Sequence, residues 1–313
     1  MIISASRRTD IPAFYSEWLM NRIRAGFLLT RNPFNYHQIS RVSLLPEDVD
    51  AIVFWTRNPT KLLPYLDELS ELGHRFYFQF TITGYPRVLE AKTLNPHKAI
   101  DVFKQLSAKV GADKVIWRYD PILFSNMLPF DEHLRLFSKL AGELEGHTRR
   151  VVISFADFYQ KTEKNLKTVD SLVYSDITHN HELCLSLSQK MADIARQHGL
   201  EIYSCAEDVD LAMQGILHGK CIDDALINTL FGLSLASSKD PGQREACGCI
   251  KSIDIGAYNT CLHGCKYCYA TFNHNLANSN FKKHDPHSPF LLGDATGVDP
   301  HLLQPVIFQQ NLF

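Results

Sequence analysis

Three of the eight cysteines lie close together near the C-terminal end, at the spacing C-x3-C-x2-C. They are Cys261, Cys265 and Cys268, and the aromatic Tyr267 directly precedes the third. Each iron of a cubane iron–sulfur cluster takes one thiolate. Three cysteines on one loop can therefore hold three irons and leave the fourth iron open to another ligand. The spacing favours a [4Fe–4S] cluster over two alternatives, a zinc site completed by His263 and a set of unliganded thiols.

The loop resembles that of the radical S-adenosylmethionine (SAM) enzymes, whose pattern is C-x3-C-x-aromatic-C. The segment from His263 to Ala270 is most similar to the branch that contains spore photoproduct lyase. The whole chain is similar to a bacterial family of unknown function that has Ser-Arg-Arg-Thr-Asp at its start (residues 6–10) and this loop at its end. The resemblance implies a [4Fe–4S] cluster that gives one electron to bound SAM, whose carbon–sulfur bond then breaks to start radical chemistry. It also implies a reductase or ferredoxin-type electron donor as a partner.

Four other cysteines, Cys205, Cys221, Cys247 and Cys249, fall in one region of the chain. Cys247 and Cys249 are two residues apart, so in an extended segment their side chains point the same way. Four thiolates suit a second [4Fe–4S] cluster or a closed zinc site, and buried thiols without a metal are the third alternative. Cys184 stands apart, because it lies at helical spacing with apolar residues and is expected in the core.

Apolar runs that predict strands alternate with segments whose apolar residues recur at helical spacing. Such alternation predicts parallel strands joined by right-handed crossovers. The expected fold class is α/β, a partial, TIM-like (β/α) barrel, with a doubly wound open sheet as the alternative. Strands are expected at 2–6, 51–55, 75–83, 114–118, 150–155, 200–204 and 252–258, with a small hairpin within 31–45. Helices are expected after Pro12, around 62–69, and at 99–110, 131–145, 181–198, 207–217 and 222–233.

The position of the cysteine loop departs from the pattern that the resemblance implies. In radical SAM enzymes the loop follows the first barrel strand, whereas here it follows the last predicted strand. If segment 252–258 pairs in parallel with segment 2–6, the chain is a circular permutation of that barrel. Each segment would otherwise expose an unpaired sheet edge. We therefore predict main-chain hydrogen bonds between them.

The permutation would put residues 6–10 where radical SAM enzymes bind the amino group of SAM, often through a Gly-Gly-Glu run. This chain has no such glycines there, but hydroxyl and carboxylate groups could accept hydrogen bonds from an ammonium. The expected cofactor-binding residues are Ser6, Arg7, Arg8, Thr9, Asp10 and Tyr267.

Charged residues also follow the predicted strands, at the rim that carries the active site in a β/α barrel. Each rim charge taken alone more often forms a salt bridge that ties the rim, but together the arginines there, Arg57 among them, suit an anionic substrate or the carboxylate of SAM. The expected catalytic residues are Arg118, Asp120, Asp157 and Glu207. Nearby aromatic residues either stack on a planar ring or fill the barrel; they are Trp55, Tyr85, Trp117 and Tyr119.

The chain has 313 residues, of which 45% are hydrophobic, and a formal net charge of −2. This length suits one β/α barrel domain over residues 1–273, with 274–313 as a C-terminal tail that wraps the surface. The near-neutral charge gives no sign of general nucleic-acid affinity. No apolar run reaches the length of a membrane span, and the N-terminal apolar run is too short for a signal peptide. We expect a reducing cytoplasm, in which cysteines serve as metal ligands rather than disulfides.

These features predict an iron–sulfur enzyme of radical SAM type that acts on a small or anionic substrate. One alternative is an iron–sulfur electron-transfer or binding protein that does not use SAM. The other is a nucleic-acid repair enzyme, which the likeness to the photoproduct lyase branch suggests.

Overall fold

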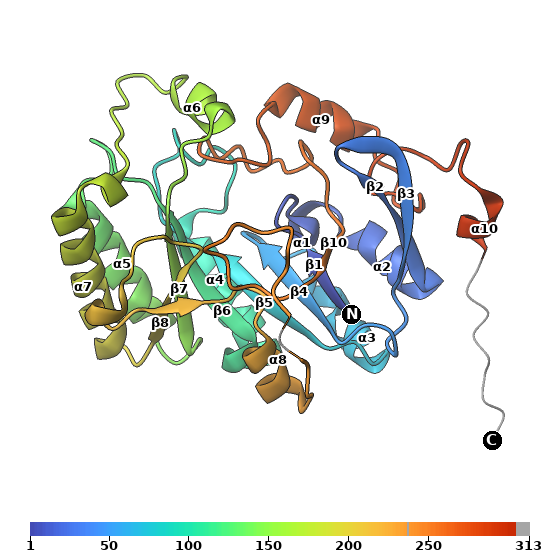
Figure 1. Cartoon of the computed structure of the whole chain (residues 1–313), viewed down its shortest axis with the longest axis horizontal. Coiled ribbons are helices and arrows are strands. Elements are labelled where there is room, and N and C mark those ends of the chain that lie inside the picture. The colour runs from blue at the N-terminus through green and yellow to red at the C-terminus, as the bar shows by residue number, and fades with distance from the viewer. Residues whose placement is uncertain (237, 305–313) are drawn as a thin grey trace.

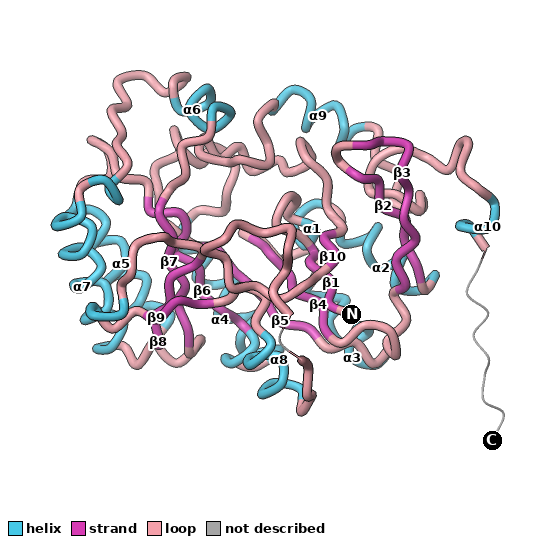
Figure 2. The backbone as a smooth tube through the Cα atoms, in the orientation of Figure 1, coloured by secondary structure: helices cyan, strands magenta, loops and turns pink. Residues whose placement is uncertain are grey.

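An eight-stranded sheet forms the centre of the molecule (Figures 1 and 2), in a computed structural model that describes residues 1–236 and 238–304. Every neighbouring pair of strands is parallel, in the order β10-β1-β4-β5-β6-β7-β8-β9. The strands are rich in apolar residues, as parallel strands buried on both faces must be. Their bounds are β1 Ile2–Ala5, β4 Ala51–Thr56, β5 Phe76–Thr81, β6 Val115–Ile122, β7 Arg150–Phe155, β8 Glu201–Cys205, β9 Leu217–Gly219 and β10 Ile253–Asp254.

Helices connect the strands, and an antiparallel hairpin projects beside them. The first helix begins where Asp10 accepts a hydrogen bond from the Ala13 N–H and Pro12 fixes the first turn. The helices are α1 Ile11–Phe14, α2 Ser16–Ala25, α3 Leu66–Glu71, α4 Pro96–Val110, α5 Phe130–Leu144, α6 Gln160–Leu166, α7 His181–Gln197, α8 Asp224–Phe231, α9 His274–Lys282 and α10 Pro300–Leu303. The hairpin pairs β2 (Phe27–Asn32) with β3 (Asn35–Ser43).

Alternate residues of each strand pack into different halves of the core. In β4, Ile52 and Phe54 join the larger cluster, which includes apolar residues of α4, α5 and α7, whereas Ala51 and Val53 face the other way. This second face is covered by α8 and by segment 247–250, whose Ile250 packs there with cysteines. One face of the sheet is therefore closed by helices that alternate with strands, and the other by the region that carries four of the eight free cysteines.

The parallel sheet confirms the α/β prediction, and all seven predicted strands and the hairpin are present. The predicted helix at 207–217 is wrong. A short 3-10 turn at Ala212–Gln214 and strand β9 occupy that segment, because Leu217 to Gly219 pair with the free edge of β8. The last predicted strand is also much shorter than expected. Among the described residues the strands pair in an open order that runs from β10 to β9, without pairing between these two end strands. Closure of the barrel therefore stays a prediction.

The predicted pairing of the two distant segments is confirmed. Strand β1 pairs in parallel with β10, with Ile3 opposite Ile253 and Ser4 opposite Asp254. The Ile255 N–H donates to the Ser4 carbonyl at 3.0 Å. The cysteine loop therefore begins at the same edge of the sheet as the loop after β1.

Residues that follow the cysteine loop pack against helix α2. Trp18 of α2 donates its indole N–H to the carbonyl of Ser288 at 3.0 Å, and Asn21 donates to that of Pro286 at 3.0 Å. The remainder of the predicted tail, residues 305–313, lies outside the described residues. Within the described part of the chain, no helix has both the length and the apolar character needed to cross a membrane.

Candidate functional site

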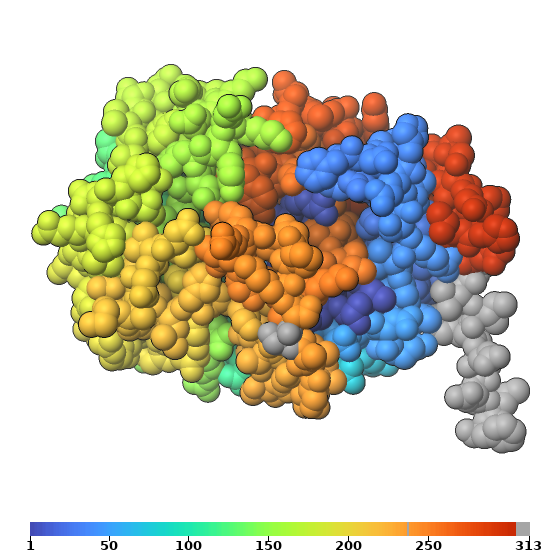
Figure 3. All heavy atoms as spheres, viewed as in Figure 1, coloured from blue at the N-terminus to red at the C-terminus, as the bar shows by residue number. Residues whose placement is uncertain are grey.

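A cavity of about 860 Å³ opens at the C-terminal ends of the strands. Its lining comes from the residues that follow β1, β4, β7 and β8 and from the cysteine loop. Figure 3 shows the segment around residue 250 (orange) over the middle of this face of the molecule. The volume is in the range of small-molecule sites. Seven of the eight cysteines line this cavity, and the buried Cys184 is the exception.

The cysteine loop is held by main-chain hydrogen bonds to the segment after β5. The Lys266 N–H donates to the carbonyl of Leu89 at 2.9 Å, and the Lys92 N–H donates to that of His263 at 2.8 Å. These bonds join residues more than 170 positions apart in the sequence. They form an isolated antiparallel β-bridge between Glu90 and Cys265, which holds the backbone of Cys265 in place. The loop is thus anchored by the segment after β5 and does not depend on its own turns alone.

The three loop thiols form a set of donors that a cation would stabilise. Burial raises the pKa of Cys261, and Asp10 and the other two loop thiols raise it further. Burial also raises the pKa of Cys265 to about 12, although Arg57 opposes this effect. The Thr271 N–H donates to the Cys268 sulfur at 3.3 Å, a contact suited to a metal-bound thiolate. Three neighbouring thiols at one cavity wall, with Cys261 and Cys265 held protonated by burial, fit an iron–sulfur cluster, whose iron would compensate the thiolate charge.

The hydroxyl groups of residues 6–10 bind the chain near β10. The Ser6 hydroxyl donates to Asp254 at 2.6 Å, and Thr9 donates to the carbonyl of Ala257 at 2.9 Å. The Asp254 carboxylate also accepts from the Arg7 N–H and from the Arg8 Nε. These contacts give Ser6, Arg8 and Thr9 a role in joining β1 to the start of the cysteine loop.

Asp10 is buried and has four hydrogen-bond donors around its carboxylate. One oxygen accepts from the Ala13 N–H and the Thr56 hydroxyl, and the other accepts from the Arg57 N–H and from His263 Nε2 at 2.6 Å. A carboxylate offers about four acceptor positions. These contacts leave Asp10 without a vacant position for an ammonium. They also engage His263, the residue expected to complete a zinc site in the alternative interpretation.

Arg7 differs from the other cations of this rim. Its guanidinium lies over the ring of Trp55, 5.6 Å from the ring centre, and its Nη2 atom is buried without a hydrogen-bond partner among the described residues. Cys249 and Cys221 are its strongest electrostatic neighbours, and despite burial they raise its pKa. Arg7 therefore presents a cation with a free donor to the cavity.

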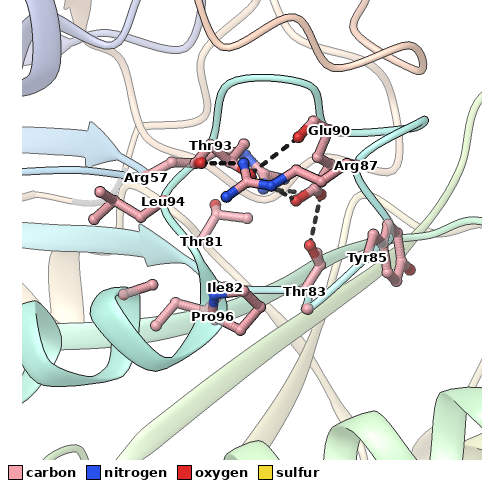
Figure 4. A pocket seen from close by; sticks show the side chains of 12 residues that line it. Arg57, Thr81, Ile82, Thr83, Tyr85, Arg87, Glu90, Thr93, Leu94 and Pro96 are labelled. Carbon is pink, nitrogen blue, oxygen red and sulfur yellow. Dashed lines mark hydrogen bonds and ion pairs between the residues drawn. The ribbon is translucent and has the colours of Figure 1, made fainter.

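Arg57 also lines a smaller pocket next to β5, which Figure 4 shows together with its partner Glu90. Arg57 donates to Glu90 at 2.9 Å and to the Tyr267 hydroxyl at 2.6 Å, and Tyr267 also bonds Glu90. Glu90 is buried, and sequence reasoning missed it, because no local pattern reveals a partner 177 positions away. Tyr267 thus lines the cavity with its hydroxyl already engaged.

Three of the four expected catalytic residues line the cavity. Burial would raise the pKa of Asp120, but hydrogen bonds and ion pairing from Arg118 and Ser154 hold it below its usual range. Burial raises the pKa of Asp157, which pairs with Arg244 at 2.8 Å. Both carboxylates are therefore already paired with arginine in the structure.

Glu207, the fourth expected catalytic residue, is not part of the cavity lining. It accepts a hydrogen bond from the Phe155 N–H at 2.8 Å, and burial raises its pKa to about 8. Its position beside the end of β7 suits support of the rim.

The rim aromatics divide between the two predicted roles. Trp55 lines the cavity. Tyr85, Trp117 and Tyr119 lie in the core on the helical face, where Trp117 stacks on Phe137 of α5. They fill space there, because alternate strand residues face opposite sides of the sheet.

The four remaining cavity cysteines come into contact. The sulfurs of Cys205 and Cys221 are 2.7 Å apart, Cys221 also bonds Cys249, and Cys249 bonds Cys247. Within residues 1–236 and 238–304, no three His, Cys, Asp or Glu side chains are placed to hold a single metal ion. The four thiols are therefore contiguous without surrounding one point.

A family model described as "Domain of unknown function (DUF1848)" matches residues 2–270. No curated protein matches the chain. Among solved structures, a dihydropyrimidinase from Brevibacillus agri NCHU1002 is similar over 64% of this chain at 13% identity and a TM-score of 0.28, and the chain spans 38% of its length. A putative alpha-L-fucosidase from Bacteroides thetaiotaomicron VPI-5482 is similar over 76% of this chain and 83% of its own, at 9% identity and a TM-score of 0.27. Likeness at this level carries no argument about function.

Proposed function

The chain belongs to the DUF1848 family, and we propose that it is an iron–sulfur enzyme of radical SAM type. The observation that supports this proposal is that Cys261, Cys265 and Cys268 all line a cavity of about 860 Å³. A cluster held there would supply one electron to SAM and so start radical chemistry on a substrate. The C-x3-C-x2-C spacing leaves one iron without a cysteine from the loop.

The other residues of the cavity position ligands and exclude water. Arg7 offers an unpartnered donor for a carboxylate or phosphate, and the neighbouring Trp55 offers a ring face for a planar group. Asp10 and Asp254 hold the loop after β1 against the start of the cysteine loop. Most of the rim arginines bind rim carboxylates, so this surface is not a run of free positive charge for a nucleic-acid backbone.

One observation favours a second candidate function, an iron–sulfur protein that does not use SAM. The hydroxyls and carboxylate of residues 6–10 are engaged in internal hydrogen bonds, so they present few acceptors for the ammonium of SAM. An iron–sulfur electron-transfer protein would need no such acceptors. This second candidate keeps the loop cluster and removes SAM.

The two functions separate in one experiment on the full chain, purified without oxygen and reconstituted with iron and sulfide. For the enzyme, SAM should change the electron paramagnetic resonance spectrum of the reduced wild-type protein. The triple variant C261A/C265A/C268A should lose this response, while C184A, altered at the cysteine outside the cavity, should keep it. A loop cluster with a spectrum that SAM leaves unchanged would establish the electron-transfer alternative. A triple variant that retained the SAM response would overturn both proposals.

A further inference from the structure

Cys205, Cys221, Cys247 and Cys249 reach the cavity from three separate parts of the fold. Cys205 ends β8, Cys221 lies two residues after β9, and the other two lie in the segment before β10. Thiol contacts join all four, as described above. Segments without a shared local motif have thus brought four free cysteines to one wall.

The backbone around these thiols is fixed by the second face of the sheet. The carbonyl of Cys221 accepts hydrogen bonds from the Tyr77 hydroxyl at 2.7 Å and from Gln79 Nε2 at 2.9 Å. The carbonyl of Cys249 accepts from the Asp240 N–H at 2.9 Å. Buried strand residues therefore hold the cysteines in position, as the ligands of a metal centre require.

Polar donors are directed at the sulfurs themselves. Arg118 Nη1 donates to the Cys221 sulfur at 2.8 Å, and the Ile222 N–H donates to the Cys249 sulfur at 3.4 Å. Arg118 is buried, so its charge acts in a medium that screens it little. Such donors stabilise thiolates, the form in which cysteine binds metals.

The arrangement distinguishes a cluster from one zinc ion. Zinc takes four thiolates around one point, commonly from C-x2–4-C pairs, whereas Cys247 and Cys249 are separated by one residue and the other two are isolated. No three of the thiols surround a single point. A cubane binds each thiolate through a different iron, so its four ligands surround a body larger than a single metal ion.

We propose that Cys205, Cys221, Cys247 and Cys249 ligate a second iron–sulfur cluster of the [4Fe–4S] type, in the same cavity as the cysteine loop. The proposal does not depend on SAM chemistry at the loop. Arg7 lines the same cavity as both groups of cysteines, and the hydroxyl of Tyr269, the residue after Cys268, donates to its carbonyl at 2.9 Å. A ligand bound by Arg7 would then share this cavity with both clusters.

The test counts iron and acid-labile sulfide in the full chain after anaerobic reconstitution, and records its Mössbauer spectrum. Wild type and C184A should each hold about eight irons per chain, because each cubane carries four. The loop variant C261A/C265A/C268A should retain about four irons with a [4Fe–4S] spectrum. Changing Cys205 and Cys249 to Ala in that loop variant should remove this iron, while its circular dichroism shows that the chain is still folded.

If the added changes at Cys205 and Cys249 prevent folding, the iron content of the loop variant alone tests the proposal. Retention of about four irons supports the second cluster, and loss of all iron overturns it. One zinc per chain in the loop variant would also overturn it, as would a disulfide detected by counting thiols in denaturant. A failure of the proposed function would be recognised by a different result. Iron that is the same in wild type and in the loop variant would show that the loop holds no cluster, whatever the four other cysteines bind.

Discussion

Asp10 and Asp254 connect the loop after β1 to the cysteine loop through hydrogen bonds that are buried or partly buried. Asp10 binds His263 of the cysteine loop and the Arg57 N–H after β4. Asp254 binds both Ser6 and Arg8. Hydrogen bonds to charged groups are stronger than neutral ones, and a buried carboxylate needs all of them to offset its lost hydration. At the scale of single residues, carboxylates therefore position the three loop thiols.

The Asp10→Asn variant should be destabilised by about 2–4 kcal/mol, because an amide group would face buried donors that cost about 1–3 kcal/mol each when unpaired. Urea unfolding under anaerobic conditions measures this change. The control is Asp113→Asn, at an exposed pair with Arg149, where little change is expected. A D10N protein as stable as wild type would show that the four hydrogen bonds do not hold the loop.

The pairing of β10 with β1 requires a close approach between two elements. Strand β10 has only two residues, so the contacts that follow it contribute much of the junction. Gly256 lies so close to the loop after β1 that an added methyl group would overlap the Ser6 side chain and stand 2.8 Å from the Thr9 hydroxyl. A side chain at this position would separate the two elements.

Gly256→Ala should lower the free energy of unfolding by about 1–3 kcal/mol, the usual cost of overpacking a tight contact. It should also lower iron retention by the loop, since the overlap displaces the residues that lead into it. Gly142→Ala on α5 is the matched control, because its added methyl would make an ordinary contact with His198 at 3.4 Å. Alanine in a helix gains about 0.5–1 kcal/mol over glycine. Equal stability of G256A and wild type would contradict the close approach.

The central sheet of the molecule has two differently covered faces, so its stability depends on packing far from the cavity. His133 of α5 is buried on the helical face, where its Nε2–H donates to the carbonyl of Leu123 at 3.2 Å and Tyr119 bonds its Nδ1 at 3.0 Å. Burial lowers the pKa of His133 from 6.5 to about 4. The neutral ring is therefore part of the folded core.

Between these two pKa values the unfolded chain binds the His133 proton and the folded chain does not, so stability should fall as the pH falls from 6.5 to about 4. The loss should reach roughly 3 kcal/mol, because about 1.4 kcal/mol accompanies each pKa unit. The His133→Gln variant should lose this part of the acid dependence, while a variant at the exposed His181 should keep it. Urea unfolding at pH 4.5 and at pH 7 would measure the loss of stability. An equal change in the free energy of unfolding between these pH values in wild type and H133Q would contradict the assignment.

The amino-acid sequence alone determined the features that depend on neighbouring residues. The C-x3-C-x2-C spacing placed three thiols on one loop, and the apolar runs predicted each long strand, because burial on both faces excludes polar residues from such runs. The pairing of the first and last strands also followed from the sequence, because parallel strands in one sheet leave edges that must be covered. The role of Asp254 was not predicted, although a lone carboxylate within a predicted strand is a local signal that hydrogen-bond donors lie nearby.

Only the tertiary structure decided contacts between distant residues. Periodicity does not say which face of the sheet a strand presents to helices, so Trp117 and Tyr119 could have faced either side. Strand β9 was missed because three residues carry too little pattern to outweigh helical spacing. The partners of Asp10, Glu90 and Arg57 lie on other elements, and four cysteines meet because α8 and β9 return their segment to the sheet. Such contacts arise from packing of the folded chain, and no local rule of the sequence contains them.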